Sequence, residues 1–223
     1  MHIKVNFGSS DTLINAKFSP SDMTLDVELT SANQQIPVSF GETTGIGEDT
    51  LGMMINDTLV IYTNRSVDEI PSYCFAHCSS LKSVDMPNVQ YIGQYAFMYT
   101  AVEKVAFPNL ANLIDYVFYN AYALRFVDLS AASLGKNVFY GAYQFKTLIL
   151  RHNDIVEIDY STFAQTGFLK SSGGGTVYVP SALLEKYENE AWLEIRERLI
   201  DVTFQPIEGS PYEHYYADGT PVE

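Results

Sequence analysis

The 223-residue sequence has few basic residues, few cysteines and no long apolar run. Thirteen Lys and Arg stand against 27 Asp and Glu, a formal net charge of −14, and the basic residues form no cluster. Phosphate backbones would repel such a chain, so we expect no nucleic-acid partner. Two cysteines are too few for a disulfide framework. No apolar run approaches the roughly 18 to 20 residues that cross a bilayer, so we expect no membrane insertion.

The motifs of the common enzyme classes are also missing. The sequence has no G-x-S-x-G, H-E-x-x-H, P-loop or dinucleotide fingerprint, and its four histidines stand in four different parts of the chain. The N-terminal residues lack the apolar segment of a secretory signal. We therefore expect a protein that is not an enzyme, binds no cofactor and is not exported through an ordinary signal.

The acidic residues divide the chain into three parts. Residues 1–60 carry eight acids and two bases, and the last 23 residues carry five acids and no base, which leaves a net charge of −3 for the middle. Hydrophobic residues make up 47% of the chain, enough for a proper core. We interpret 1–50 as an N-terminal β segment with a linker, 51–202 as the central domain and 203–223 as an acidic, aromatic tail.

An internal repeat organises the middle part. Each copy has an apolar residue five places before a Phe, and successive Phe residues are 22, 21, 21 and 24 residues apart. The pairs are Ile70/Phe75, Ile92/Phe97, Leu113/Phe118, Leu134/Phe139 and Ile158/Phe163. A short strand-like alternation follows in each copy, for example at Val84 and Met86. This spacing is typical of a solenoid in which each repeat buries its apolar face only against its neighbours.

The run IPSYCFAHCSSLKSVDMPNVQYIGQYAF resembles the BspA-type leucine-rich repeat, with its pattern I-x-x-x-x-F-x-x-C-x-x-L. The copy at 70–92 matches almost fully, whereas the copies at 113–134 and 134–158 have Ser130 and Arg151 in place of the usual Pro. The resemblance and the patterns at the two ends of the chain together predict a β-rich α+β fold: a short leucine-rich-repeat solenoid of about five repeats with an N-terminal β segment and a C-terminal capping helix. The resemblance also implies a binding scaffold, as in bacterial surface proteins and phage-borne proteins, rather than catalysis.

Both ends of a solenoid need cover. After the last strand, Ser181 is a good N-cap, and an apolar stripe predicts one capping helix over 181–200. Alternation predicts N-terminal strands at 3–7, 25–29 and 36–40. Three strands bury too little apolar surface to form a stable domain alone, so we expect assembly through residues 1–50. We expect the tail to be extended, with aromatic residues that dock on a neighbour.

The 16 tyrosines are the main candidates for a binding surface. Several recur at fixed positions around the repeated Phe that the core does not need: Tyr73, Tyr95, Tyr116, Tyr119, Tyr122, Tyr140 and Tyr143. Recurrence at one register predicts vertical ladders on the solenoid. Two interpretations stay open: the rings stack on one another and cover the turns, or they form a recognition surface for a protein or a glycan.

Two apolar residues are candidates on the outward strand face. Phe126 and Ile149 alternate with core positions and so are expected to face solvent. Exposed apolar side chains within a polar frame often mark contact sites.

Cys74, His77 and Cys78 have the residue types of a zinc site. A structural zinc site needs four ligands, and no second Cys or His pair lies nearby in the sequence. Both cysteines also align with small or apolar residues of the other repeats, so we interpret them as packing residues and expect no metal.

The sequence thus predicts a non-enzymatic binding and assembly protein, with a protein or glycan partner. The first hypothesis is a structural or receptor-binding component of a phage virion, in a fibre, a baseplate or attached to the head. The alternative is a free-standing adhesin at the bacterial cell surface or secreted. A third hypothesis, an enzyme acting on glycans, would require a close pair of carboxylates in a cleft.

Overall fold

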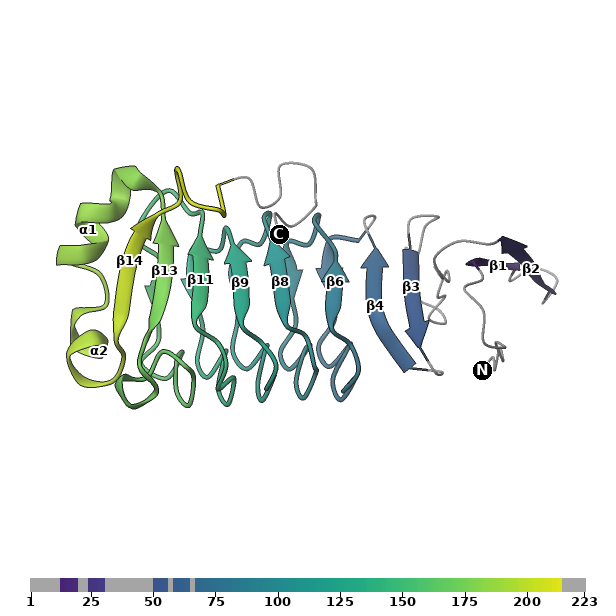
Figure 1. Cartoon of the computed structure of the whole chain (residues 1–223), viewed down its shortest axis with the longest axis horizontal. Coiled ribbons are helices and arrows are strands. Elements are labelled where there is room, and N and C mark those ends of the chain that lie inside the picture. The colour runs from purple at the N-terminus through teal and green to yellow at the C-terminus, as the bar shows by residue number, and fades with distance from the viewer. Residues whose placement is uncertain (1–12, 20–23, 31–49, 56–57, 65–66, 214–223) are drawn as a thin grey trace.

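The structure is a computed structural model that describes residues 13–19, 24–30, 50–55, 58–64 and 67–213. Its main feature is an eight-stranded sheet in the spatial order β14-β13-β11-β9-β8-β6-β4-β3 (Figure 1). The strands are β3 (Thr50–Ile55), β4 (Thr58–Asn64), β6 (Ser83–Asp85), β8 (Lys104–Phe107), β9 (Phe126–Leu129), β11 (Thr147–Leu150), β13 (Gly175–Val179) and β14 (Val202–Pro206). All neighbours pair in parallel except β3 and β4, which are antiparallel. A parallel sheet with few helices confirms the predicted repeat solenoid.

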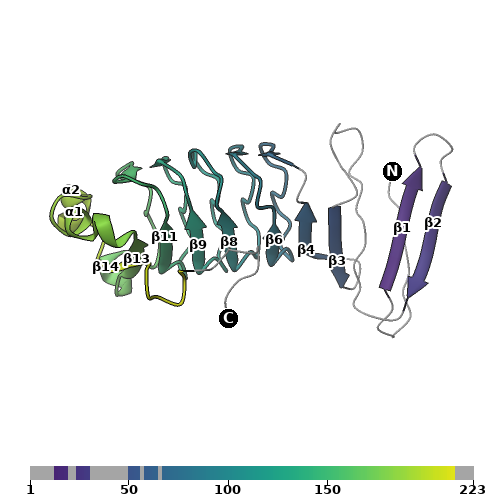
Figure 2. The same ribbon diagram turned by 90° about the horizontal axis from the view of Figure 1, so that it is seen from above.

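Two short parallel ladders lie apart from the main sheet. Strand β5 (Glu69–Ile70) pairs with β7 (Tyr91–Ile92), and β10 (Ser133–Leu134) pairs with β12 (Glu157–Ile158). Seen from above, the main sheet runs along one side of the solenoid and the loops of the coils project from its other side (Figure 2).

A ladder of stacked phenylalanine rings fills the space inside the coils. The ring centroids of Phe75, Phe97, Phe118, Phe139 and Phe163 lie 5.2, 5.1, 5.8 and 6.0 Å apart in succession. All five side chains are buried, as are the inward residues of the strands such as Val105, Val127 and Leu148. One turn of chain cannot bury such a ring, so each coil depends on the next for its core.

The C-terminal end of the solenoid is covered by short helices rather than by one. The single helix expected over 181–200 is wrong: a 3-10 turn at Ser181–Leu183 leads into α1 (Leu184–Asn189), and α2 (Leu193–Arg198) follows after a break. A further 3-10 turn spans Lys170–Ser172. None of these helices is long and apolar enough to cross a bilayer.

The break between α1 and α2 comes at Trp192, which has a left-handed φ of 55°. In this position the Trp192 Nε1–H donates to the Val156 carbonyl at 2.8 Å, and the Val156 N–H donates to the Tyr187 hydroxyl at 2.8 Å. The Trp192 ring also lies 5.8 Å from Phe163 and 5.6 Å from Phe204. Tyr187 and Trp192 thus bind the N–H and the carbonyl of the same residue, Val156, and hold the last coil from both sides in a way that a straight helix would not provide.

The C-terminal part of the chain is not a free tail from residue 203. Strand β14 extends the main sheet to Pro206, and Phe204 is part of the buried core. Residues 207–213, which we call the strap, then turn back over the outer face of the sheet, visible as the yellow loop beside β11 and β9 in Figure 2. The expected docking of tail aromatics on a neighbour is wrong for Tyr212, which packs on its own sheet; Tyr215 and Tyr216 lie outside the described residues.

The N-terminal segment contains one antiparallel hairpin among the described residues. Strand β1 (Leu13–Ser19) pairs with β2 (Thr24–Thr30) over seven residues. Strand β2 covers the strand expected at 25–29, whereas β1 was not predicted. The strands expected at 3–7 and 36–40 lie outside the described residues.

Because Phe118 has a stacked ring on both sides and no exposed surface, we expect Phe118→Ala to lower the free energy of unfolding by about 3–5 kcal/mol. The matched control is Tyr91→Ala, which removes an aromatic ring that is 61% exposed and should change stability by about 0.5 kcal/mol or less. Urea unfolding followed by circular dichroism measures both. Equal effects of the two substitutions would contradict the dependence of each coil on the ring ladder.

Candidate functional site

The structure gathers the seven predicted tyrosines into one continuous array of rings at the turns of the coils. Tyr95 stacks between Tyr73 and Tyr116 at 5.1 and 5.0 Å. Tyr119 and Tyr140 stack at 5.0 Å, and Tyr122 and Tyr143 at 6.4 Å. An edge contact of Tyr119 with Tyr95 and a tilted contact with Tyr116 join the first two ladders.

Sequence reasoning missed two members of this array. Tyr99 lies 6.4 Å from Tyr119 and 5.9 Å from Tyr122, and so joins the third ladder to the others. His77 stacks on Tyr99 at 5.0 Å. Both residues stand two places after the repeated Phe, which is the signal that could have found them. The tyrosine array is therefore Tyr73, Tyr95, Tyr99, Tyr116, Tyr119, Tyr122, Tyr140 and Tyr143, with His77 at one edge.

Five of these residues hold an unusual backbone conformation. Tyr73, Tyr95 and Tyr116 have φ of 61°, 59° and 62°, and His77 and Tyr99 have φ of 63° and 56°. Left-handed φ favours Gly and Asn and costs a bulky side chain roughly 1–2 kcal/mol. The fourth coil has Asn137 and Gly141 at these two positions, with φ of 50° and 78°, as backbone preference alone would select. Tyr in the first three coils is therefore present for its side chain.

The hydrogen bonds between coils explain why the left-handed positions recur. The N–H groups of Tyr73, Phe75 and His77 donate to carbonyl oxygens of the next coil, at 3.1, 2.9 and 2.8 Å. The Phe97 and Tyr99 N–H groups donate to the following coil in the same way. Alternate N–H groups point along the solenoid axis only when the chain turns left-handed on each side of the Phe, so the backbone holds the tyrosines in register.

The array presents ring edges and hydroxyl groups to solvent rather than ring faces. Within each ladder the planes are nearly parallel, with interplanar angles of 6° to 16°, so most faces are covered by the ring of the next coil. Tyr73, Tyr122 and Tyr143 remain 56%, 46% and 56% exposed. The neighbouring rings desolvate Tyr95, Tyr119 and Tyr122 and raise the pKa of these phenols, so their hydroxyls stay protonated at neutral pH.

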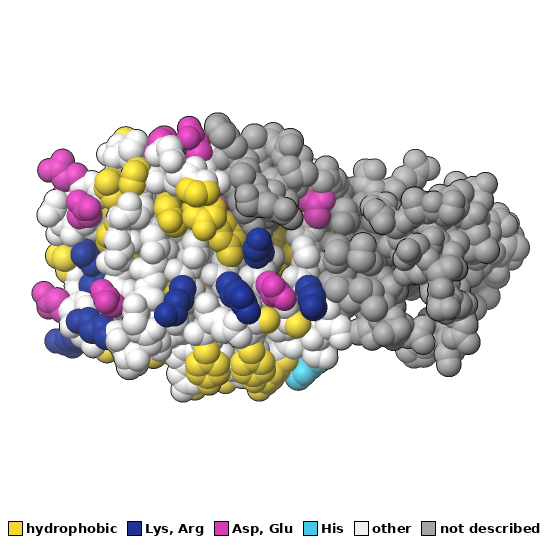
Figure 3. Space-filling view, in the orientation of Figure 1, with side chains coloured by type: hydrophobic (Ala, Val, Ile, Leu, Met, Phe, Trp, Pro, Cys, Tyr) yellow, Lys and Arg dark blue, Asp and Glu magenta, His cyan; other side chains and the backbone are white. Residues whose placement is uncertain are grey.

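A row of basic side chains runs beside the array. Lys82, Lys104, Arg125 and Lys146 are all exposed, and each stands seven residues after the Phe of its coil. Figure 3 shows Lys and Arg side chains in a row above the apolar lower edge of the molecule, with an acidic group among them. The chain as a whole is strongly acidic, so this row is a local reversal of charge beside the rings.

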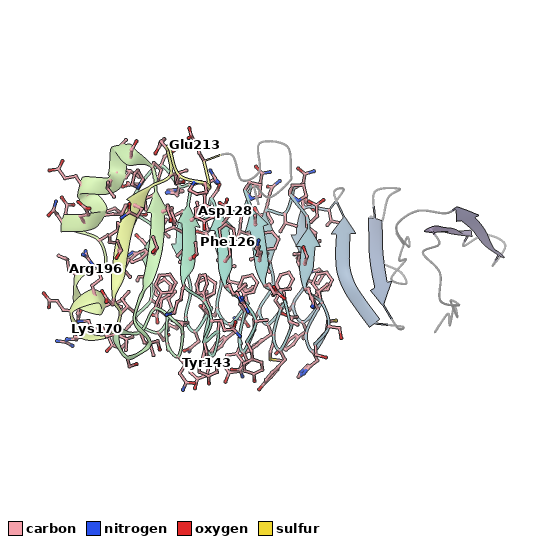
Figure 4. All side chains as sticks on the ribbon, in the orientation of Figure 1. Phe126, Asp128, Tyr143, Lys170, Arg196 and Glu213 are labelled. Atoms are coloured by element: carbon pink, nitrogen blue, oxygen red, sulfur yellow. The ribbon has the colours of Figure 1, made fainter. Side chains whose placement is uncertain are left out.

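The expectation that Phe126 and Ile149 face solvent is wrong. They lie at outward positions of β9 and β11, as the alternation predicts, but are only 6% and 0% exposed. The reason is the strap, whose Ile207 and Tyr212 pack against them in a small apolar cluster separate from the main core. Figure 4 shows Phe126 and Asp128 on the sheet with Glu213 of the strap above them.

The zinc-like residues do not form a metal site. Cys78 packs against the core, as expected, but Cys74 is exposed, so its interpretation as a packing residue is wrong. Although Cys74 is exposed as a residue, the atoms around both sulfurs partly desolvate them and raise the pKa of both thiols, which disfavours the thiolate form that binds zinc. Within the described residues no group of three or more His, Cys, Asp or Glu could hold a metal ion.

A groove beside the short ladders is the place among the described residues where the enzyme hypothesis can be examined, because three carboxylate residues line it. It is lined in part by Asp115, Glu157 and Asp159. Asp115 accepts the Lys136 N–H at 2.8 Å, and the Ser161 hydroxyl and N–H donate to Asp159 at 2.7 and 2.9 Å. The Ser161 contacts lower the pKa of Asp159, whereas a glycosidase acid needs a raised pKa. These contacts give two of the carboxylates a structural role.

Comparison with known proteins identifies the family. A family model described as the BspA type leucine-rich repeat region matches residues 42–125 and 68–175, in six copies against the five or so expected. The chain belongs to this family of leucine-rich repeats, which indicates a protein-binding role. No curated protein matches the chain.

One solved structure is similar to the chain, a leucine-rich repeat protein from Bacteroides ovatus. The two share 15% identity with a TM-score of 0.35, and the match covers 80% of this chain. The chain spans 60% of the length of that protein.

Tyr95 tests whether the array stabilises the coils. We expect Tyr95→Ala to destabilise the protein by about 1–3 kcal/mol, because it removes two stacked contacts and one edge contact. Tyr95→Asn should cost less, since Asn tolerates the left-handed φ of 59°. Urea unfolding of both variants, with the 53% exposed Tyr160→Ala as control, measures the difference. If both Tyr95 variants behave like the control, the rings do not couple the coils.

Proposed function

We propose that the chain is a non-enzymatic binding protein whose tyrosine array docks a protein partner. The observation that carries this proposal is the exposure of Tyr73, Tyr122 and Tyr143 at 56%, 46% and 56%, because rings that only coupled the coils would not need so much surface in solvent. Large rings with protonated hydroxyls give contact area and hydrogen bonds at low cost in side-chain entropy. The family membership supports a protein as the partner.

The geometry of the rings favours a protein over a glycan. A sugar ring binds an aromatic residue through the aromatic face, and the faces within the ladders are covered by neighbouring rings. Ring edges and hydroxyls suit the mixed polar and apolar surface of a protein. The adjoining basic row, from Lys82 to Lys146, favours acidic groups at the rim of the partner's surface and a faster association at low salt.

Cross-linking tests this proposal without knowledge of the partner. With p-benzoylphenylalanine in place of Tyr122 or Tyr143, we expect the same protein adduct from both positions after irradiation in extracts of the source culture. The control position is Tyr91 in β7, which is 61% exposed and is not a member of the array, and it should give none of this adduct. Adducts that are equal at all three positions, or glycan-array binding that depends on Tyr122 and Tyr143 without any protein adduct, would contradict a protein-docking array.

We extend the proposal to the place where the protein acts. It is a structural or receptor-binding component of a phage virion, anchored through residues 1–50; the alternative is a bacterial surface or secreted adhesin. Among the described residues, β1 pairs only with β2, and a lone two-stranded hairpin is marginally stable in water. A larger assembly that holds this hairpin would supply the missing stability.

The solution mass tests the anchoring role. We expect the full chain to form a defined oligomer by size-exclusion chromatography with light scattering, and a chain of residues 50–223, which keeps β3 and the rest of the main sheet, to be a monomer. A monomeric full chain, or an oligomer that persists in the shorter chain, would contradict assembly through residues 1–50.

A further inference from the structure

The outer face of the sheet carries an apolar trough that the repeat itself leaves open. Ala106 on β8, Phe126 on β9, Ile149 on β11 and Tyr178 on β13 occupy the outward positions of four successive strands, opposite the core. They form a cluster of their own, separate from the main core. The strap covers this trough, and the apolar residues there are buried by the strap rather than by the neighbouring coils.

The strap lies in the trough through two side chains. Ile207 is 6% exposed within the cluster, and the Tyr212 ring lies 5.2 Å from Phe126 and 4.8 Å from Tyr178, the latter edge-on. Five positions separate the two anchors. Between them, Glu208 and Gly209 are exposed, so the strap contacts the sheet mainly at its ends.

Arg151 recognises the backbone of the strap. Its Nη2 donates to the Tyr212 carbonyl at 2.7 Å, and its Nη1 lies 3.4 Å from the Glu213 carbonyl. The same guanidinium makes a bidentate pair with Asp128, whose side chain is only 2% exposed. Burial raises the pKa of Asp128, and the Arg151 hydrogen bonds act in the opposite direction.

A buried ion pair contributes little net stability compared with apolar residues of the same size, so it is a costly way to build a mere cover. The advantage of this ion pair is that it fixes the orientation of the Arg151 guanidinium. Asp128 fixes the fork of Arg151 so that the remaining N–H groups face a peptide carbonyl, and such donors bind a backbone whatever its side chains are. The trough therefore has both parts of a peptide site: apolar contacts for two anchors and a fixed donor for the backbone.

The strap can leave without loss of the sheet. Among the described residues, one backbone hydrogen bond joins the strap to a strand, from the Ile207 N–H to the Val179 carbonyl at 2.9 Å. The exposed Glu208 carboxylate also accepts the Ser181 N–H at 2.8 Å. Strand β14 ends at Pro206 and keeps its own pairing with β13. Gly209, with a φ of 77° and no atom within 4 Å of where its Cβ would be, provides a free turn in the strap.

We propose that this trough is a second binding site, for an extended protein segment that has an aliphatic and an aromatic side chain five positions apart. The strap is its built-in occupant, which a partner segment must displace. The site is independent of the tyrosine array, because it lies on the outer sheet face and uses none of the array residues.

A labelled peptide of residues 205–213 is the probe, measured by fluorescence anisotropy on the full chain. The double variant Ile207→Ser/Tyr212→Ser removes both anchors and should free the trough. We expect this variant to bind the peptide at least about tenfold more tightly than the unaltered chain, whose tethered strap competes at a high effective concentration. A peptide with Ser at both anchor positions should not bind. Tyr160→Ser, at a 53% exposed position outside both the array and the strap, is the matched control and should behave like the unaltered chain.

Arg151→Lys in the double variant tests the donor. Lys keeps a positive charge beside Asp128 but loses the fork, so the peptide affinity should fall about tenfold while circular dichroism still reports the folded sheet. Hydrogen exchange of residues 207–213 reports whether the strap is released. The proposal is overturned if the released variant does not bind the peptide, if binding ignores the anchor side chains, or if loss of both anchors leaves the strap protected.

Discussion

Each coil of this protein buries its phenylalanine against the phenylalanine of the next coil, and Trp192 covers the last one, Phe163. The stack from Phe75 to Phe163, with centroids 5.1 to 6.0 Å apart, is therefore the contact on which the rest of the structure depends. It fixes the distance between coils, and that distance allows the turn N–H groups to reach the carbonyls of the neighbouring coil. The main sheet, the left-handed turns and the tyrosine array all follow from one repeated spacing.

The spacing between coils also imposes backbone strain on the turns. To aim alternate N–H groups along the axis, the chain adopts a left-handed conformation on each side of the Phe, and in the first three coils Tyr or His occupies most of these positions. Ring contacts worth about 0.5–1.5 kcal/mol each offset part of the strain. The tyrosines thus act both as cover for the turns and as exposed surface, so the two interpretations that the sequence left open describe the same side chains.

The repeat was predictable from the sequence because its information is local and periodic. The Phe spacing predicted the coils, and the recurrence of Tyr73, Tyr95 and Tyr116 at one register predicted their ladder, which the ring stacking confirms. The strap was not predictable, because Tyr212 contacts Phe126, a residue more than eighty positions away in the sequence, and no periodic pattern indicates such a contact. The break at Trp192 was missed for a similar reason: an apolar stripe predicts a helix, whereas the clamp on Val156 is a tertiary contact that outweighs it.

The hydrogen bonds of the turn ladder all run in one sense, and this gives the solenoid a polarity. Every coil donates N–H groups to the coil that follows it, so among the described residues the coil around Phe75 gives hydrogen bonds in this ladder and receives none. Its turn carbonyls form a row of acceptors at one end of the stack, while the helices α1 and α2 cover the opposite end. A further turn of chain could extend this ladder at the acceptor end only by donating N–H groups, so the two ends of the stack offer different backbone chemistry to a neighbouring chain.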